Sequence, residues 1–464
     1  MQNIKFGTDG WRAIIAKDYT VANVERVATA TADWVLLNNN GKPKIVIGHD
    51  CRFGGELFLK ASAAIFASKG IDVIAAKGFV STPMISYATK KFDAQIGVVI
   101  TASHNPPSYN GFKLKAQFGG PASPAVIAQV EDLIPSNADS YLEEFDQLVQ
   151  YGKIVFEDLE TIYCQMIQAS FDMEAIKTLK FGYDAMYGAG QNVIKRLFPE
   201  SFKLHCEHNP SFNEQAPEPI HKNLLEFSQA LKQDPTLQVG FANDGDADRI
   251  GMYDGNGEFV DSHHIILLLI HYLCKYKGLS GKIVVAFSVT EKIVKLCKHY
   301  GLDLEVTKIG FKYIAEKMTV EDVLVGGEES GGIAVGTFIP ERDGIFIALT
   351  IMEFMAKTGK SINALIQEVY EIIGSFAYSR DDLHITETLK QSIIQNCKNG
   401  KYEAFGQYPV QSVRDTDGFK FFISDDEWVM IRPSGTEPVL RVYCEAENAQ
   451  KVRTVLDKVK ETIL

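Results

Sequence analysis

Four segments of the sequence carry polar side chains and glycines directly after an apolar run that predicts a β-strand. In open α/β sheets, ligands bind beyond the carboxyl ends of the strands, so these loops are the first candidates for chemistry. Each loop offers a different kind of side chain. The segments are Gly97–Lys113, Phe241–Arg249, Val323–Gly332 and Trp428–Arg441.

The first segment, GVVITASHNPPSYNGFK, offers a hydroxyl nucleophile. A strand predicted over 97–101 leads to Ser103, and His104 and Lys113 supply the proton acceptor and the positive charge that a hydroxyl needs to carry a phosphoryl group. A proline-punctuated turn, in which Ser103 and Asn105 bond only to backbone groups, explains the same residues. Taken alone, the segment favours the turn.

The second segment, FANDGDADR, alternates the carboxylates Asp244, Asp246 and Asp248. Carboxylates this close repel one another unless a cation neutralises them, and oxygen ligands suit Mg²⁺ or Ca²⁺. A calcium EF-hand needs Gly at the sixth loop position and Glu at the twelfth, where this sequence has Arg249 and Gly255. Because strands are predicted on both sides, an unneutralised triad would be costly. The pattern favours Mg²⁺ over a solvated acidic turn.

The third segment, VLVGGEESGG, places Glu328, Glu329 and Ser330 between two pairs of glycines. Glycines let the backbone approach a ligand closely, and a carboxylate can accept hydrogen bonds from sugar hydroxyls. A glycine-rich turn without a ligand fits the pattern equally well. By itself, this segment leaves both interpretations open.

The fourth segment, WVMIRPSGTEPVLR, has Arg432 at the end of one predicted strand and Arg441 on the next. Between them, Ser434, Gly435 and Thr436 predict a turn whose N–H groups and hydroxyls would form an anion nest. Arginine binds phosphate through two parallel hydrogen bonds. A surface β-turn explains Ser-Gly-Thr but not the flanking arginines, so the segment indicates a phosphate clamp, although not of the Walker pattern.

The four segments lie on separate, domain-sized stretches of the chain. We therefore expect a cleft shared by several domains. A hydroxyl, a metal site, a polyol-binding loop and a phosphate clamp in one cleft indicate phosphoryl transfer on a phosphorylated sugar.

The composition is that of a folded, acidic protein. The 464 residues include 47 Lys and Arg against 59 Asp and Glu, a formal net charge of −12, and 46% are hydrophobic. This composition argues against disorder and against a general nucleic-acid binder, which needs clustered basic residues. It gives no indication of a phosphate ligand. At roughly 150 residues per domain, the length suggests about three domains.

Features that direct proteins out of the cytosol are missing from the sequence. The N-terminal residues form no apolar signal region, and no stretch approaches the ~18 apolar residues that span a bilayer. The seven cysteines are scattered and include no C-x-x-C pair, which predicts free thiols rather than disulfides or a zinc knuckle. We expect a cytoplasmic protein with no membrane or nucleic-acid partner.

Helical and strand patterns alternate along the chain, which predicts an α/β fold with largely parallel sheets. Thr20 is the expected cap of a first helix, and a helix over about 56–69 should end at Gly70. A faint repeat of strand, turn and helix begins near residues 45, 179 and 283. Any α/β protein contains such triplets, so the repeat alone decides nothing.

Read together, the motifs resemble the α-D-phosphohexomutases, the phosphoglucomutase and phosphomannomutase superfamily. Each motif is moderately specific, and the ordered set, which covers the whole chain, is highly specific. The matching motifs are FGTDGWR at 6–12, TASHNP at 101–106 with NGFK at 110–113, DGDADR at 244–249, GEESGG at 327–332 and RPSGTEP at 432–438.

The resemblance implies a four-domain phosphohexomutase architecture around a central cleft, with three related α/β domains of mixed or parallel sheets and a smaller C-terminal α+β domain. The faint repeat then reflects the three related domains. We expect the phosphoserine loop in 1–142, the metal loop in 143–257, the sugar loop in 258–372 and the phosphate clamp in 373–464.

The resemblance also implies roles for individual residues. Ser103 would be phosphorylated in the active enzyme, and its phosphate would share Mg²⁺ with the carboxylates of residues 244, 246 and 248. Around it would act His104, Lys113 and Arg249, with His104 or Lys113 assisting proton transfer. The residues that would bind substrate are Arg12, Lys308, Gly310, Lys312, Glu328, Ser330, Arg432, Ser434, Gly435, Thr436 and Arg441.

The implied reaction interconverts a hexose 1-phosphate and a hexose 6-phosphate, which makes the enzyme an intramolecular phosphotransferase, an isomerase. A hexose 1,6-bisphosphate is the intermediate, and glucose 1,6-bisphosphate would be an activator. The partner is a small phosphosugar, and the enzyme would be a monomer or a homodimer.

The sugar loop bears on the substrate, because bifunctional glucose/mannose enzymes and glucosamine mutases often end it with His, where this chain has Gly332. GEESGG is closer to glucose-preferring members, so glucose phosphate ranks first and mannose phosphate second, ahead of glucosamine or pentose phosphate. Two other classes are a metal-dependent phosphatase, which would not need a second phosphate clamp, and a non-catalytic sugar-phosphate sensor, which would tolerate loss of Ser103 or an Asp.

Overall fold

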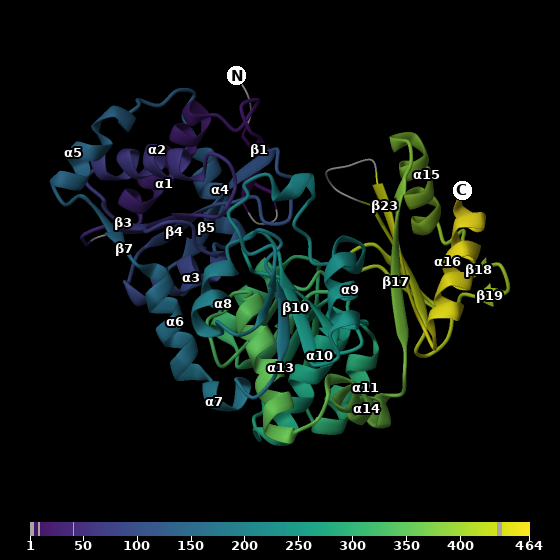
Figure 1. The fold of residues 1–464 in the computed structure, drawn as a ribbon. Helices are drawn as coiled ribbons and strands as arrows, with labels where there is room; N and C mark the ends of the chain where they lie inside the picture. The colour runs from purple at the N-terminus through teal and green to yellow at the C-terminus, as the bar shows by residue number, and fades with distance from the viewer. Residues whose placement is uncertain (1–3, 8–9, 40, 434–438) are drawn as a thin grey trace. The chain divides into compact units, whose positions relative to one another are not determined.

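The computed structural model describes residues 4–7, 10–39, 41–433 and 439–464. The chain forms two compact units: unit 1 comprises 1–282 and 310–365, and unit 2 comprises 283–309 and 366–464. Figure 1 traces both along the chain. None of the described helices is both long enough and apolar enough to cross a membrane.

The first sheet of unit 1 has the strand order β1-β5-β4-β2-β3-β7, with β6 beside β5. Strands β2, β3, β4 and β7 are parallel, whereas β5 runs antiparallel to β4 and to β1. The strands are β1 (Trp11–Ile14), β2 (Lys44–His49), β3 (Asp72–Ala76), β4 (Ile96–Ile100), β5 (Tyr109–Ala116), β6 (Gly120–Pro121) and β7 (Ile154–Glu157).

Helices cover both faces of this sheet, with α1 and α2 on one side and α3 on the other (Figure 1). The first helix begins as predicted, because the Thr20 hydroxyl accepts the N–H of Asn23 at 3.3 Å. The helices are α1 (Val21–Leu37), α2 (Gly55–Ser68), α3 (Thr82–Lys91), α4 (Pro124–Asp132), η1 (Leu142–Glu144) and α5 (Phe145–Gln150). Strand β7 joins this sheet although it lies beyond residue 142, and the four domain boundaries remain predictions.

The second sheet of unit 1 has the order β12-β11-β10-β8-β9. Its strands are β8 (Phe181–Asp184), β9 (Phe202–Leu204), β10 (Val239–Asn243), β11 (Ile250–Asp254) and β12 (Phe259–Val260). Strands β8, β9 and β10 are parallel, and β11 is antiparallel to its neighbours. The accompanying helices are α6 (Leu159–Ser170), α7 (Met173–Ile176), α8 (Gln191–Leu197), η2 (Phe212–Glu214), η3 (His221–Asn223) and α9 (Leu225–Gln233).

Unit 1 also contains an antiparallel pair, β15 (Val323–Gly327) and β16 (Ile333–Val335). The helices of this region are α10 (Ser262–His271), η4 (Tyr272–Tyr276), α12 (Phe311–Val320) and α13 (Gly344–Thr358), and α14 (Ile362–Ile373) starts here and continues into unit 2. Helix α13 packs on α10 and on β10 and β11.

Unit 2 contains the parallel strands β13 (Lys282–Ala286) and β14 (Leu304–Thr307) with helix α11 (Lys292–Tyr300). Its larger sheet is fully antiparallel, in the order β17-β23-β22-β21-β20, and α16 packs on it. The elements are β17 (Ala377–His384), β20 (Ser412–Arg414), β21 (Phe419–Phe422), β22 (Trp428–Pro433), β23 (Val439–Ala446), the hairpin β18 (Ala404–Phe405) and β19 (Tyr408–Pro409), α15 (Glu387–Lys398) and α16 (Ala449–Ile463).

The faint repeat has a structural basis. The three segments that begin near residues 45, 179 and 283 form β2, β8 and β13, and each is followed by a helix and a parallel neighbour, β3, β9 and β14. The predicted α/β fold, with parallel and mixed sheets and a smaller C-terminal region, is confirmed.

Candidate active site

Strand β4 ends just before Ser103, which lies 1% exposed in a tight loop. Its backbone φ of 53° is in the left-handed region, which costs energy in a residue other than glycine. The hydroxyl donates to Asp244 Oδ2 at 2.7 Å and lies 3.3 Å from His104 Nδ1. The loop therefore joins the predicted nucleophile to the predicted metal site, so the residues do more than form a turn.

The Asp triad occupies the connection between β10 and β11, and all three side chains are fully buried. One carboxylate oxygen from each residue lies within 4.8 Å of the other two. Asp246 Oδ1 and Asp248 Oδ1 have no hydrogen-bond partner among the described residues. These two buried carboxylate oxygens lack a protein donor, which fits a hard divalent cation such as Mg²⁺.

Basic side chains surround the triad. Lys113, fully buried on β5, contacts Asp246 Oδ2 at 2.8 Å and Asp248 Oδ2 at 3.1 Å. Arg342 Nη2 lies 2.7 Å from Asp248 Oδ2, and Arg249 Nε lies 4.0 Å from Asp248 Oδ1. The site therefore concentrates positive charge in a chain that is acidic as a whole.

The burial and crowding of these groups shift their pKa values. Burial, and then the charges of Asp246 and Asp248, raise the pKa of Asp244 well above its usual range. Burial alone would also raise the pKa of Asp246, but the ion pair with Lys113 lowers it below the usual range. Burial, and then the charges of Arg249, Arg12 and Lys113, lower the pKa of His104 well below its usual value, which favours the neutral imidazole.

Arg12, on the edge strand β1 beside β5, reaches the same loop. Its Nη1 donates to Asn105 Oδ1 at 2.6 Å, and its guanidinium lowers the pKa of His104. Unit 1 thus brings together Arg12, Ser103, His104 and Lys113 with the triad and Arg249.

The sugar loop follows β15. Glu328 is 6% exposed, its Oε1 accepts the N–H of Gly310 at 2.8 Å, and burial raises its pKa. A bridge between Arg249 and Gly332 connects this loop to the metal loop. A Cβ at Gly332 would lie 2.6 Å from Arg342 Cδ, so Arg342 fills the space that a side chain would need. Ser330 is half-buried in the same turn.

The other predicted substrate-binding residues are more scattered. Lys312 lies in the first turn of α12, with its ammonium group over the ring of Tyr313. In unit 2, Lys308 is exposed after β14. Arg432 Nε donates to Asp417 Oδ1 at 3.1 Å, and Arg441 Nε lies 4.0 Å from Asp382 Oδ1. Ser434, Gly435 and Thr436 lie outside the described residues.

Sequence reasoning missed three residues of the site. Thr82 donates to Asp246 Oδ2 at 2.5 Å, Arg342 pairs with Asp248, and Arg52 donates to the Ser103 carbonyl at 2.5 Å. All three are buried polar or charged side chains that lie far along the chain from their partners. Arg52 stands two residues after Asp50 at the end of β2, a strand-end position that could have marked it.

Gly245, between the first two carboxylates of the triad, packs against the Ser103 loop. A Cβ at this position would lie 2.5 Å from the Ser103 carbonyl oxygen and 3.1 Å from Pro217 Cγ. The glycine is therefore required by a close approach of two backbones.

Comparison with known proteins assigns the chain to a family. Models of the phosphoglucomutase/phosphomannomutase α/β/α domains I, II and III match residues 3–140, 161–257 and 261–373, and the model of the C-terminal domain matches 398–462.

Individual proteins agree with this assignment. The chain is 31% identical to the phosphoglucomutase/phosphomannomutase of Thermococcus kodakarensis, over 97% of this chain and 96% of that protein. It is 30% identical to the phosphoglucosamine mutase of Caldicellulosiruptor bescii, with the same two coverages.

A crystal structure from Thermus thermophilus, provisionally assigned as a phosphomannomutase, superposes with a TM-score of 0.87 at 31% identity, over 100% of this chain and 99% of that one. The chain therefore belongs to the phosphoglucomutase/phosphomannomutase family, and it is a phosphohexomutase, an isomerase.

Proposed function

We propose that the enzyme interconverts hexose 1-phosphate and hexose 6-phosphate through a phosphoserine at position 103. The observation that carries this proposal is the contact between a strained, buried Ser103 and the Asp triad, where the hydroxyl donates to Asp244. A hydroxyl held against a cation site, with Lys113 and Arg249 beside it, is arranged for phosphoryl transfer.

The proposed reaction has two transfers of opposite direction. The bond between phosphorus and Ser103 Oγ breaks as the O6 hydroxyl of a hexose 1-phosphate attacks, which yields a 1,6-bisphosphate and a free Ser103 alkoxide that takes up the proton released by O6. After the sugar turns over, Ser103 Oγ attacks the phosphorus at O1 and its proton passes to that oxygen, which leaves hexose 6-phosphate.

We assign the proton transfer to His104, because its Nδ1 lies 3.3 Å from Ser103 Oγ and its lowered pKa favours the neutral form that can accept a proton. Lys113 donates to two carboxylates, so it contributes positive charge rather than a base. Mg²⁺ bound by Asp244, Asp246 and Asp248 would neutralise charge on the transferring oxygens. Glucose 1,6-bisphosphate would activate the enzyme by phosphorylating Ser103.

For the substrate, we propose glucose phosphate. Gly332 supports this choice, because Arg342 fills the space that a His at the end of the sugar loop would need. The similarity to a phosphoglucosamine mutase makes glucosamine phosphate the competing candidate, and mannose phosphate follows. Glu328 and Ser330 would bind sugar hydroxyls, while Arg432 and Arg441 would hold the phosphate that does not react.

The test is an initial-rate assay with glucose, mannose, glucosamine and ribose 1-phosphates, in the presence of Mg²⁺ and a trace of glucose 1,6-bisphosphate. We expect the highest kcat/KM with glucose 1-phosphate and no turnover by Ser103→Ala. Release of inorganic phosphate in place of a 6-phosphate would identify a phosphatase. Near-normal mutase activity of Ser103→Ala would overturn the phosphoserine mechanism.

We also propose a cytoplasmic enzyme that works as a monomer or a homodimer. The thiols support the location, because none of the seven cysteines forms a disulfide in the structure and six of them are buried. Size-exclusion chromatography with light scattering decides between the two oligomeric states.

A further inference from the structure

We propose that Arg52 is a positioning residue for the phosphoryl transfer, and that Phe212 holds Arg52 in place from a neighbouring domain. The proposal rests on the function proposed above, because it concerns the geometry of the Ser103 nucleophile. Arg52 is 3% exposed and follows β2. The contacts described above join it to the Ser103 loop and not to the carboxylates of the triad.

The guanidinium of Arg52 binds the Ser103 loop through its backbone. Its Nη2 donates to the carbonyl oxygens of Ser103 at 2.5 Å and Asn105 at 2.7 Å, and its Nη1 donates to those of Pro106 at 2.9 Å and Tyr109 at 3.2 Å. Four carbonyl groups of one loop thus converge on one side chain. Only a planar guanidinium has enough donors, in a fixed geometry, to hold all four.

The N–H of Ser103 is held by the same region of the chain. It donates to Thr101 Oγ1 at 2.9 Å, and the Thr101 hydroxyl donates to Asp50 Oδ2 at 2.6 Å. Asp50 Oδ2 also lies 3.2 Å from Arg52 Nε. The Asp50–Arg52 pair therefore fixes both backbone groups of Ser103, one through Thr101 and the other directly.

This double attachment explains how Ser103 keeps its left-handed backbone, with φ at 53°. Such a conformation persists only when the surroundings over-determine it. A relaxed backbone at Ser103 would turn its Oγ away from Asp244, with which it now makes a 2.7 Å hydrogen bond. Arg52 thus sets the direction of the nucleophile without touching the reacting atoms.

The ring of Phe212 packs against the guanidinium group of Arg52. Its ring centroid lies 4.8 Å from the Arg52 guanidinium carbon, and the ring is 2% exposed. Phe212 belongs to η2, in the stretch that follows β9 of the second sheet, so the segment that holds Arg52 comes from a different domain than the Ser103 loop. A buried ring over a guanidinium attracts it through a cation–π interaction.

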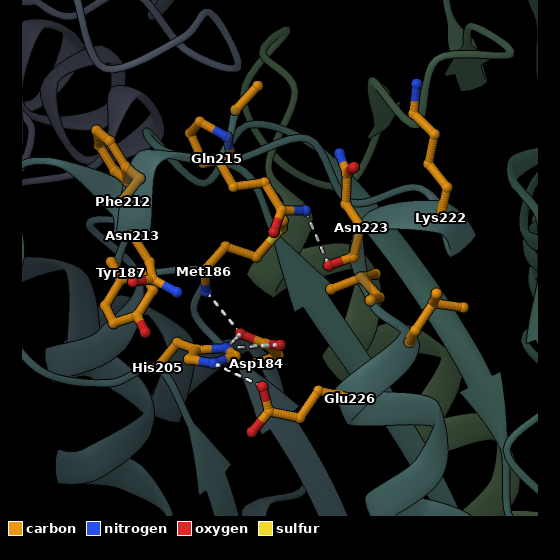
Figure 2. A pocket seen from close by; sticks show the side chains of 14 residues that line it. Asp184, Met186, Tyr187, His205, Phe212, Asn213, Gln215, Lys222, Asn223 and Glu226 are labelled. Carbon is orange, nitrogen blue, oxygen red and sulfur yellow. Dashed lines mark hydrogen bonds and ion pairs between the residues drawn. The ribbon is translucent and has the colours of Figure 1, made fainter.

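Phe212 lines a cavity of about 270 Å³. Its ring points away from His205 and Asp184, which line the same cavity (Figure 2). Phe212 and its neighbour Asn213 have φ values of 46° and 52°, so the backbone that presents the ring is itself strained. A strained backbone beside the nucleophile's support indicates that the position of this ring is functionally constrained.

The test compares Arg52→Lys, Phe212→Leu and Phe212→Tyr with a matched control, Arg26→Lys. Arg26 also donates to a backbone carbonyl, that of Pro135 at 2.7 Å, but lies outside the site. We expect Arg52→Lys to lower kcat about 100-fold, the effect of misplacing a reacting group by about 1 Å, while KM stays within about threefold.

We expect Phe212→Leu, which removes the ring face at similar volume, to lower kcat about tenfold. Phe212→Tyr keeps the ring face over the Arg52 guanidinium, so it should retain near-normal kcat per folded molecule. Arg26→Lys should be unchanged. A merely structural role would lower the melting temperature and the active fraction alike, but would leave kcat per folded molecule intact.

A second readout is the phosphorylation of Ser103, followed by intact mass during incubation with glucose 1,6-bisphosphate. Arg52→Lys should be phosphorylated more slowly by the same factor as its loss in kcat. A folded Arg52→Lys with kcat within about threefold of the parent overturns the proposal. If Arg52→Lys does not fold, an unchanged kcat in Phe212→Leu overturns it.

The two proposals fail in different ways. If Ser103→Ala keeps mutase activity, the phosphoserine mechanism is wrong whatever Arg52 does. If Ser103→Ala is inactive and Arg52→Lys is fully active, only the positioning role of Arg52 is wrong.

Discussion

The Ser103 site in unit 1 and the arginine pair of unit 2 hold their charged groups very differently. Lys113 and Asp246 are fully buried and paired at 2.8 Å. Arg432 keeps 20% of its side chain exposed and lies beside half-buried Asp417, and Arg441 keeps 31% exposed and lies beside exposed Asp382. One region is fixed by buried, crowded charges, whereas the other presents charges near the surface.

This difference fits the roles proposed for the two regions, phosphoryl transfer in unit 1 and phosphate binding in unit 2. Bond making and breaking need reacting atoms within tenths of an ångström, which only a packed environment provides. A clamp for the non-reacting phosphate must accept either end of the sugar, so it needs charge and donors more than a rigid fit. Substitutions in unit 1 should therefore act on kcat, and substitutions in unit 2 on KM.

The largest expected effect is that of Asp246→Asn. It removes one of three converging carboxylates and the partner of Lys113, so kcat should fall by more than the roughly 100-fold that follows loss of an outer-shell partner of a metal ligand. Steady-state kinetics with Mg²⁺ titration measures it. The matched control, exposed Asp139→Asn, should be unchanged. Normal kcat at normal Mg²⁺ affinity would remove the triad from the mechanism.

The next effect is on stability. A divalent cation binds the folded triad, so a concentration of about 100 times Kd should stabilise the protein by about 2.7 kcal/mol. Chelation should lower the melting temperature and abolish activity, and added Mg²⁺ should restore both. Differential scanning calorimetry with and without chelator measures the shift. Asp246→Asn should lose most of this shift, and an equal shift in that variant would contradict the site.

A smaller effect is expected in unit 2. Arg432→Lys replaces a bidentate fork with a point charge, so KM for the sugar phosphate should rise about tenfold, or ~1.4 kcal/mol, while kcat changes little. Arg453→Lys is the control, since Arg453 pairs with Asp381 in the same unit. If Arg432→Lys instead lowers kcat at constant KM, the contrast between the two regions is wrong.

The smallest effect is expected at Glu445, and it concerns stability rather than turnover. Glu445 is fully buried on β23 opposite Trp428. Burial raises the pKa of Glu445 to about 7, although Lys420 opposes the shift. Between pH 4.5 and about 7, the folded protein therefore keeps a proton on Glu445 that the unfolded chain releases. The contribution of Glu445 to stability is greatest below this window, decreases as pH rises through it, and levels off above it.

Glu445→Gln should flatten this dependence and raise the free energy of unfolding at pH 8 by up to about 1.4 kcal/mol per unit of pKa shift, which would appear as a higher melting temperature. Thermal unfolding at pH 5.5 and pH 8 measures it, with exposed Glu447→Gln as the control. An unchanged pH dependence in Glu445→Gln would show that Glu445 stays ionised.

Local signals in the sequence were enough for much of the fold. Thr20 caps α1 as expected, and the triad's alternating carboxylates do converge, in the short connection between two paired strands. The strand-end loops also pointed to Ser103 and Glu328. These predictions rest on residues that are neighbours in the chain.

Contacts between distant segments were not predictable. Arg342 and Thr82 reach the triad from positions with no motif of their own, and Arg52 needs the fold to bring four carbonyls to it. The net charge was also uninformative, because the site's basic groups are a small, buried subset of an acidic chain. The specificity between hexoses depends on such contacts, and so the sequence alone only ranks the candidates.

Gly245 lies where the Asp triad loop of the second domain packs against the Ser103 loop of the first, so the lack of a side chain there matters to both domains. A single methyl group there would lie 2.5 Å from the carbonyl oxygen of Ser103, so the Asp triad loop and the Ser103 loop fit one another at the scale of one carbon atom. The two domains cannot be exchanged independently with those of a distant relative unless that fit is preserved. Substitutions that alter this contact in the first domain must therefore be matched by substitutions in the second.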